Sequence, residues 1–309
     1  MIGSAIIGWG GALPDRVVTN HDLEQTLDTS DQWITERTGI RERRIGGSTT
    51  SLAHEAASRA LEAGAIDPES IDLLVLATCT PDQIMPASAP TLQDRLGLRC
   101  GAFDVNAACS GFVYALGSAY GFLETGMDRV LVVGSDTMSA ITDWDDRGTA
   151  VLFADGAGAL VLERRPDSDG GLQALDLGTE GASRDILYTD HGGKIVMKGH
   201  EVFKQAVRAV VGSVEAALAQ ASLQAGDIAL VIPHQANDRI VDAVAARMGL
   251  DHLQVVTILD RTGNTSAGSI PMAFAHAADS GRLSPGDLVL FAGFGAGMSW
   301  GTAIVRYQP

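Results

Sequence analysis

The sequence has few of the features that mark membrane, secreted or disordered proteins. Its 309 residues contain no apolar run that approaches the ~18 residues needed to cross a membrane. The first residues, MIGSAIIGWGGALP, lack the basic region and long apolar core of a signal peptide and predict a β-strand instead. No linker rich in Pro, Gly or Ser divides the chain, and its 46% hydrophobic content excludes wholesale disorder. We therefore expect a soluble, cytoplasmic protein with no membrane partner.

Cysteine and basic residues are also scarce. The three cysteines, Cys79, Cys100 and Cys109, are too few for a disulfide framework, and their spacing matches no zinc site. We expect free thiols in a reducing compartment and no metal. The 22 Lys and Arg residues are outnumbered by 38 Asp and Glu residues, so the net charge is −16. Because an acidic surface repels phosphate backbones, nucleic acid is excluded as the expected partner.

Strand and helix patterns alternate along most of the chain, which predicts an α/β fold. Short apolar runs typical of buried strands occur at 72–78, 130–133, 229–232 and 288–292. Helical periodicity predicts helices at 51–64, opening at a serine and stopping at a glycine, and at 202–221.

An internal repeat relates the two parts of the chain. DLLVLATCT begins at Asp72 and its counterpart DIALVIPHQ begins at Asp227, 155 residues later. FDVNAACSG resembles LDRTGNTSAG at nearly the same offset. This repeat predicts two pseudo-equivalent halves, residues 1–165 and 166–309, with an active site between them. It also places Cys79 opposite His234, and the Cys109 loop opposite the Asn264 loop.

Cys109 is the candidate nucleophile. Its segment, FDVNAACSGF, joins a strand that ends near Val105 to an apolar helix that starts directly after the cysteine. A thiol at a helix N-terminus has its pKa lowered from ~8.5 by the helix dipole and the free N–H groups. An inert buried cysteine is the alternative, and we adopt that interpretation for Cys79 and Cys100.

Polar residues of the second half provide candidate partners. His234, in IPHQAND, follows a predicted strand at the end where α/β proteins bind ligands, although a structural histidine is the alternative. Asn264, in TGNTSAGSIP, lies in a small-residue turn before another apolar helix, where a simple turn or N-cap asparagine is the alternative. The segment GFGAGMSWG is either a tight hairpin or a source of unobstructed N–H groups for an oxyanion hole.

Together these motifs resemble the thiolase superfamily and, within it, the β-ketoacyl-acyl-carrier-protein synthase III family. The resemblance covers the whole chain and includes TSDQWITERTGIRERR, DRGTAVLFADGAGA, MKGHEVFKQAV, PHQAND, GNTSAGSIP and GFGAGMSWG. It implies a thiolase-like fold of two pseudo-duplicated α/β halves, layered α-β-α-β-α, with Cys109, His234 and Asn264 as the catalytic triad.

The sequence departs from related families in three places. The C-terminal glycine segment lacks the second catalytic cysteine of degradative thiolases, and Asn264 occupies the position where elongating synthases have a second histidine. Ala296 replaces the middle one of three glycines, which an N–H donor tolerates if its backbone does not need a positive φ.

The resemblance implies a decarboxylative Claisen condensation that starts fatty-acid synthesis. Cys109 would take the acyl group from an acyl-CoA, with the N–H groups of Cys109 and Ala296 as the oxyanion hole. His234 and Asn264 would then hydrogen-bond the thioester carbonyl of malonyl-acyl carrier protein while CO₂ is lost. The carbanion would attack the acyl-enzyme and give 3-oxoacyl-acyl carrier protein, without a metal or a redox cofactor.

The resemblance also assigns binding residues, with the CoA adenine between Trp33 and Arg147. The expected CoA contacts are Thr29, Trp33, Arg37, Arg147, Gly148, Gly199, Phe203, Ala236 and Asn237. The expected docking residues for the acidic carrier protein are Lys204, Arg239 and Arg247. The expected acyl pocket comprises Met85, Phe153 and Phe294, with Met85 contributed by the partner of a homodimer and flexible enough for a longer or branched primer. Without the resemblance, these would be helix-face, surface-charge and core residues.

Three other functions remain open at this point. A homologue dedicated to a specialised, polyketide-type pathway would have the same triad. A Cys-His hydrolase would also use Cys109 and His234, although the Asn264 and glycine turns favour condensation. A non-catalytic paralogue is the third alternative, and the presence of all three triad residues argues against it.

Overall fold

A computed structural model of the protein describes residues 2–309. Its first sheet has the order β1-β7-β6-β4-β5, and its second sheet has the order β11-β12-β13-β8. The first comprises β1 (Ser4–Ala12), β4 (Leu73–Ala77), β5 (Gly101–Val105), β6 (Arg129–Thr137) and β7 (Asp155–Arg164). The second comprises β8 (Gly171–Thr179), β11 (Leu230–Pro233), β12 (Leu288–Gly295) and β13 (Ser299–Arg306).

The two sheets repeat one pairing pattern. β4 runs parallel to β6, which is antiparallel to β7, which is antiparallel to β1. In the same way β11 runs parallel to β12, which is antiparallel to β13, which is antiparallel to β8. A parallel bridge between Val231 and Val255 occupies the place of the β4–β5 pair. The expected pseudo-duplication is confirmed, and the proposed division at 165/166 falls in the link between β7 and β8.

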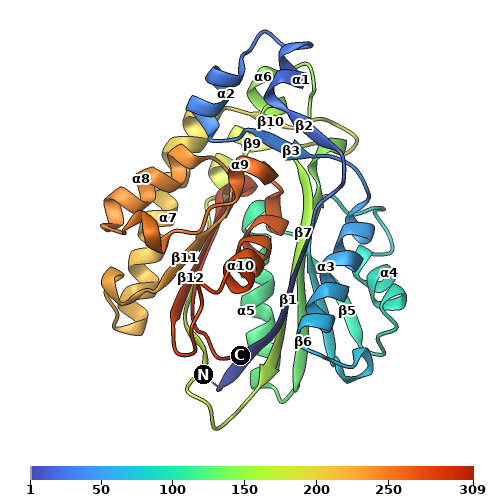
Figure 1. The fold of residues 1–309 in the computed structure, drawn as a ribbon, viewed down its shortest axis with the longest axis vertical. Coiled ribbons are helices and arrows are strands. Elements are labelled where there is room, and N and C mark those ends of the chain that lie inside the picture. Colours follow the sequence, from blue (N-terminus) through green and yellow to red (C-terminus); the bar gives the residue numbers. More distant parts are fainter. Residues whose placement is uncertain (1) are drawn as a thin grey trace.

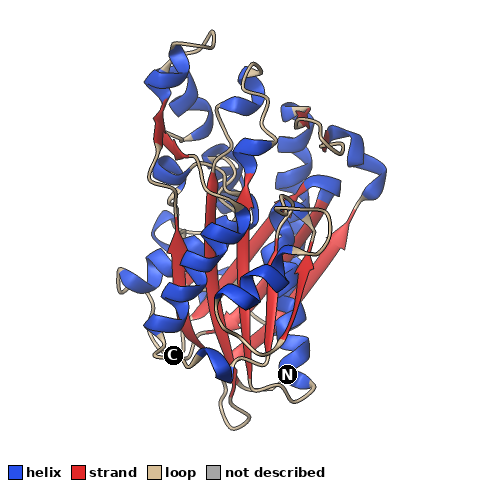
Figure 2. Cartoon of the chain, turned by 90° about the vertical axis from the view of Figure 1, so that its right-hand side faces the viewer, coloured by secondary structure: helices blue, strands red, loops and turns tan. Residues whose placement is uncertain are grey.

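The helices form three layers around the two sheets, so the chain is layered α-β-α-β-α as expected (Figure 1). The central layer consists of α5 (Gly111–Glu124) and α10 (Ser269–Asp279), whose apolar residues belong to the core between the sheets. The outer layers are α3 (Thr49–Ala63) with α4 (Ser88–Arg95), and α7 (Gly199–Ala221) with α8 (Asp238–Met248). Figure 2 shows the strands running along the length of the molecule, with helices in front of them.

The predicted strands are all present, and two helix starts need correction. The helix expected from Ser51 starts at Thr49, because the hydroxyl of Ser48 accepts the N–H of Ser51 and caps it. Ser51 is therefore the third helical residue, and its own hydroxyl accepts the N–H of Ser48 in a capping box. The helix expected from Val202 starts three residues earlier, at Gly199.

Short elements form a cap at one end of the molecule (Figure 1). They are β2 (Val17–Thr19), α1 (Asn20–Glu24), α2 (Asp31–Thr38), β3 (Glu42–Arg44), α6 (Arg147–Ala150), β9 (Leu187–Tyr188), β10 (Val196–Met197) and α9 (Leu259–Thr262). The two chain ends lie close together at the opposite end, where the N–H of Ile6 donates to the carbonyl of Gln308 at 3.0 Å. Within residues 2–309, no helix is both long and apolar enough to cross a membrane.

Candidate active site

The candidate site lies where parallel strands of both sheets end, beneath the cap. Cys109 follows β5, His234 follows β11, and Asn264 lies in the turn between α9 and α10. The carboxyl ends of parallel strands are the usual binding edge of an α/β sheet. Three turns that are remote in sequence therefore supply the candidate residues to one end of the molecule.

Cys109 is buried in a short 3₁₀ turn, Ala108–Ser110, that precedes α5. Ala108, directly before the cysteine, has a positive φ of 48°, which is uncommon for a residue with a side chain. Burial raises the pKa of the Cys109 thiol to about 12, although the nearby hydroxyl of Ser266 acts in the lowering direction. The expectation of a lowered pKa is therefore wrong for the free protein, because burial is the largest influence on this thiol and acts in the raising direction. The thiol is protonated before substrate binds.

Asn264 is held by hydrogen bonds on both of its peptide groups. Its N–H donates to the carbonyl of Leu152, and its carbonyl accepts the N–H of Ala154, both at 2.9 Å. Its side-chain oxygen Oδ1 accepts the N–H of Ser266 at 2.9 Å. Because the amide oxygen is occupied by this backbone donor, the side-chain NH₂ group of Asn264 is the part left to donate elsewhere.

Ser266 links the two halves at the candidate nucleophile. Its hydroxyl lies 3.7 Å from the sulfur of Cys79 and acts to lower the pKa of the nearby Cys109 thiol. Ser266 has a positive φ of 51°, close to that of Ala108, and both residues open a 3₁₀ turn before a central helix. The sequence analysis missed Ser266, because a serine in a small-residue turn gives no signal until its partners are known.

His234 is buried at the end of β11, with a relative exposure of 7%. Its N–H donates to the carbonyl of Ala292 at 2.7 Å, and its ring nitrogen Nδ1 lies 2.7 Å from Oγ of Ser269. Burial lowers the pKa of His234 to about 3, so the imidazole is neutral at pH 7. Ser269, which the sequence analysis also missed, is the first residue of α10.

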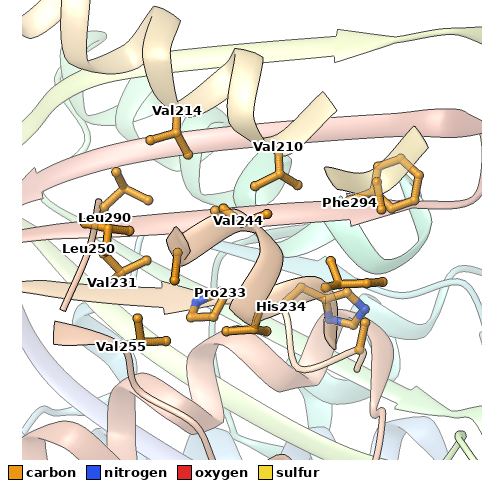
Figure 3. A pocket seen from close by; sticks show the side chains of 16 residues that line it. Val210, Val214, Val231, Pro233, His234, Val244, Leu250, Val255, Leu290 and Phe294 are labelled. Carbon is orange, nitrogen blue, oxygen red and sulfur yellow. The ribbon is translucent and has the colours of Figure 1, made fainter. Parts of the chain in front are cut away.

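One side of His234 faces an apolar cavity of about 50 Å³ between α7, α8 and the strands β11 and β12. His234 and Phe294 lie towards one end of the cavity, and Leu250 and Leu290 lie towards the other (Figure 3). His234 is the one polar residue among the sixteen that line it. This wall supplies no charge or hydrogen bond that would stabilise a protonated imidazole.

The glycine segment approaches Cys109 closely. A Cβ atom on Gly295 would lie 2.6 Å from the backbone nitrogen of Cys109, so only glycine fits there. Ala296 follows at the start of the next turn, and the positive φ values fall on Gly297 (73°) and Met298 (50°) instead. Alanine is therefore tolerated at position 296, as expected, because the backbone of Ala296 does not adopt a positive φ.

The expected acyl-pocket residues fall in three different places. Phe153 is buried beside Asn264, with which it forms a parallel β-bridge, and packs in one apolar cluster with Met138 and Ile195. Phe294 lines the cavity beside His234. Met85 is 86% exposed in the single chain, on the loop before α4.

Two arginine side chains stack on the ring of Trp33, the residue expected to bind adenine. The guanidinium carbons of Arg37 and Arg147 lie 4.8 and 4.7 Å from the ring centroid of Trp33. Arg147 also donates to the carbonyl of Asp28 at 2.6 Å. A purine between Trp33 and Arg147 would therefore have to displace the Arg147 side chain from the ring.

The other expected CoA residues lie on the cap and at the starts of α7 and α8. Asn237 caps α8 and donates from its side chain to the carbonyl of Arg37 at 3.0 Å, while Ala236 lines the cavity beside His234. Gly199 and Phe203 lie in the first turns of α7, Thr29 lies two residues before α2, and Gly148 is the second residue of α6. The expected docking residues Lys204, Arg239 and Arg247 are all exposed, and Arg208 is exposed one turn after Lys204 on α7.

Comparisons with known proteins agree along the full length of the chain. Family models described as 3-oxoacyl-[acyl-carrier-protein] synthase III and its C-terminal part match residues 103–181 and 218–307. A β-ketoacyl-[acyl-carrier-protein] synthase III from Erythrobacter litoralis is 50% identical, over 99% of this chain and 100% of its own.

Solved structures give the same result. The 3-oxoacyl-[acyl-carrier-protein] synthase III of Aquifex aeolicus is 43% identical with a TM-score of 0.97, covering 99% of this chain and 100% of its own. The priming β-ketosynthase of the R1128 polyketide pathway is 35% identical with a TM-score of 0.94, covering 100% of this chain and 97% of its own. With this fold, these turns and full-length identity of this order, the chain belongs to the β-ketoacyl-[acyl-carrier-protein] synthase III family of acyl-transferring condensing enzymes.

Proposed function

We propose that this protein condenses an acyl-CoA primer with malonyl-acyl carrier protein to give 3-oxoacyl-acyl carrier protein, the step that starts fatty-acid synthesis. The observation that carries the proposal is the junction at Ser266. Its N–H orients the amide of Asn264, and its turn, Ser266–Gly268, packs against the turn Ala108–Ser110 that carries Cys109. A nucleophile from one half and a hydrogen-bond donor from the other are thus coupled through one turn.

In the first stage, the sulfur of Cys109 attacks the acyl-CoA thioester and the C–S bond to CoA breaks. Because the pKa of the Cys109 thiol is about 12, its proton leaves as the sulfur attacks, and the departing CoA sulfur takes it up. The N–H groups of Cys109 and Ala296 stabilise the oxyanion. The contact between Gly295 and the backbone of Cys109 supports this role, since it brings the two segments together.

In the second stage, malonyl-acyl carrier protein loses CO₂ and becomes an enolate. His234 and Asn264 donate hydrogen bonds to its thioester oxygen, which stabilises the developing negative charge. The carbanion forms a C–C bond with the acyl carbon on Cys109, and the C–S bond to the enzyme breaks. A proton from solvent restores the thiol. Since no step needs electrons from outside, the reaction requires no redox cofactor.

The primer chain lies in the apolar cluster around Phe153, which adjoins Asn264 and also includes Met138 and Ile195. Phe294, beside His234, closes the site on the other side. CoA enters beneath the cap with its adenine between Trp33 and Arg147. A local basic patch of Lys204, Arg239 and Arg247 binds the acidic carrier protein. Because acyl-CoA and acyl carrier protein are the substrates, we propose that the enzyme acts in the cytoplasm.

The functional unit is a homodimer in which Met85 of one subunit reaches the acyl pocket of the other. β5 supports this proposal, because it is the edge strand of the first sheet and its residues 102–105 are only partly buried. An unpaired edge strand is an aggregation hazard in a monomer. Ile84 and Met85, both 86% exposed, lie on the loop that precedes α4, the helix packed against β5.

A specialised pathway is the second candidate, favoured by the likeness to the R1128 priming enzyme. The two candidates differ in the primer and in the carrier protein, not in the triad. Intact mass spectrometry after incubation with acyl-CoAs from acetyl to decanoyl identifies both the acylated protein and the preferred primer. A fatty-acid enzyme should then release CO₂ from malonyl groups on the fatty-acid carrier protein, and activity only with a polyketide carrier protein would favour the second candidate.

A further inference from the structure

The side chain of Ser269 makes two hydrogen bonds in a fully buried position. Its oxygen lies 2.7 Å from Nδ1 of His234 and accepts the backbone N–H of Gln235 at 3.3 Å. No other polar partner of this hydroxyl is found among residues 2–309. The direction of the hydrogen bond between Ser269 and His234 can therefore be deduced by counting the donors and acceptors of these groups.

A hydroxyl has one proton to donate and two lone pairs to accept with. If Nδ1 of His234 carried the ring proton, both Nδ1 and the N–H of Gln235 would donate to Ser269. The hydroxyl proton of Ser269 would then be buried without an acceptor, and buried donors are rarely left unpaired because the loss is costly. If Ser269 donates to Nδ1, each of the three groups is satisfied.

The remaining surroundings of the ring keep it neutral. The cavity side of His234 is lined by apolar side chains such as Pro233 and Phe294 (Figure 3). No carboxylate pairs with His234 among the ion pairs of the described residues. A neutral imidazole has one proton, and an accepting Nδ1 leaves that proton on Nε2.

We propose that Ser269 is a positioning residue that donates a hydrogen bond to Nδ1 of His234 and so holds the ring in the tautomer protonated at Nε2. The proposal rests on the proposed function, in which Nε2 donates to the thioester carbonyl. A neutral ring with its proton on Nε2 cannot take the thiol proton of Cys109 at that nitrogen. Ser269 thereby assigns His234 to decarboxylation rather than to the activation of the thiol.

The test is the tautomer itself, read by NMR on ¹⁵N-histidine-labelled free enzyme, with His234→Gln used to assign the signal. We expect wild-type His234 to be neutral and protonated at Nε2. We expect Ser269→Ala to lose this preference, to decarboxylate malonyl-acyl carrier protein about 10-fold or more slowly, and to acylate Cys109 at close to the wild-type rate.

The matched control is Thr265→Val, four residues earlier in the same turn. The hydroxyl of Thr265 is buried without a partner, so its removal should leave the tautomer and both half-reactions unchanged. Wild-type His234 protonated at Nδ1 would overturn the proposal without reference to any variant. So would a Ser269→Ala enzyme with an unchanged tautomer and unchanged decarboxylation. If wild type formed no acyl-enzyme, the proposed function would fail, while the NMR result would still report on Ser269.

Discussion

The surroundings of the three thiols differ at the scale of single residues. Cys109 lies against the backbone of the glycine segment and the hydroxyl of Ser266. Cys79 lies 3.9 Å from the sulfur of Met138, and burial raises the pKa of its thiol well above the ordinary value. Cys100 is partly buried at the start of the edge strand β5. Only Cys109 combines a glycine-lined approach with the donors expected of an oxyanion hole.

Cys109→Ala should therefore abolish the acyl-enzyme, whereas Cys79→Ala and Cys100→Ala should keep most of it. Intact mass spectrometry after incubation with acyl-CoA measures all three. Peptide mapping then locates the label. An acyl group on Cys79 or Cys100 in the wild-type enzyme would show that the nucleophile is wrongly assigned.

The buried His234 predicts a pH dependence of stability. The folded pKa of about 3 is below the ordinary value of 6.5, so between these pH values the unfolded chain binds a proton that the native state does not. Stability then rises with pH across this window, by up to ~1.4 kcal/mol per pH unit for one group. His234→Gln should reduce the slope of the unfolding free energy, measured by urea titration between pH 4 and 6. An identical slope in the variant would contradict the low pKa.

At the scale of elements, the turn before α10 depends on Gly263. This residue has a φ of 68°, and a Cβ atom there would lie 2.9 Å from the Cβ atoms of both Ala154 and Arg43. Arg43 is itself fully buried and donates to the carbonyls of Val18 and Val151. The position of Asn264 is thus set by packing between Arg43 of the cap and Ala154, the residue before β7.

Gly263→Ala should destabilise the protein by about 2 kcal/mol through strain and collision. It should slow decarboxylation more than acylation, because Asn264 moves and Cys109 does not. The matched control is Gly281→Ala, which has the same φ of 68° but no atom within 4 Å of the added carbon. If both variants lost stability and activity equally, backbone strain alone would explain the result and the packing argument would fail.

The same turns show which features of the fold and the site could be predicted from the sequence. Periodicity located the central strands and the main helices, because their apolar residues are buried in the pattern that each element requires. The repeat placed Cys109 opposite the Asn264 loop, and the two turns share a positive φ at Ala108 and Ser266. The burial of the Cys109 thiol could not be predicted from the sequence, and it reverses the expected direction of the shift in the Cys109 pKa. Ser266 and Ser269 were missed because single serines in a small-residue turn give no signal until their partners are known.

At the scale of the whole molecule, one buried carboxylate joins the two halves. Asp136, at the end of β6, is fully buried and accepts hydrogen bonds from Thr78, Cys79 and Thr80 of the first half. Its second oxygen accepts the N–H of Ala267, from the second half, at 3.0 Å. All of these partners are donors, so the site is built for a carboxylate.

Asp136→Asn should lower the free energy of unfolding by about 3 kcal/mol, because its NH₂ group would face donors. Chemical denaturation measures this change. Asp94→Asn, an exposed site on α4, is the control for loss of charge alone and should change stability by less than ~0.5 kcal/mol. Equal stability of Asp136→Asn and wild type would mean that this junction contributes little to joining the halves.

The proposed homodimer can be tested by measuring the mass of the protein in solution. Light scattering at micromolar concentration should give the mass of a dimer, and Met85→Asp should weaken it. Leu253→Asp is the matched control, since Leu253 is 82% exposed but lies in the turn after α8, in the half of the chain that does not contain β5. A wild-type monomer would contradict the homodimer, and dissociation by Leu253→Asp would place the interface elsewhere.

The meeting of the two chain ends at the end opposite the cap has a practical consequence. A purification tag, a fluorophore or a surface linker attached at either end of this chain would lie at the opposite end of the molecule from the cap. The two ends of this chain could also be joined by a short peptide and the chain reopened in the link between β7 and β8. Such a circular permutant would begin with the half that carries His234 and end with the half that carries Cys109, with every strand pairing preserved.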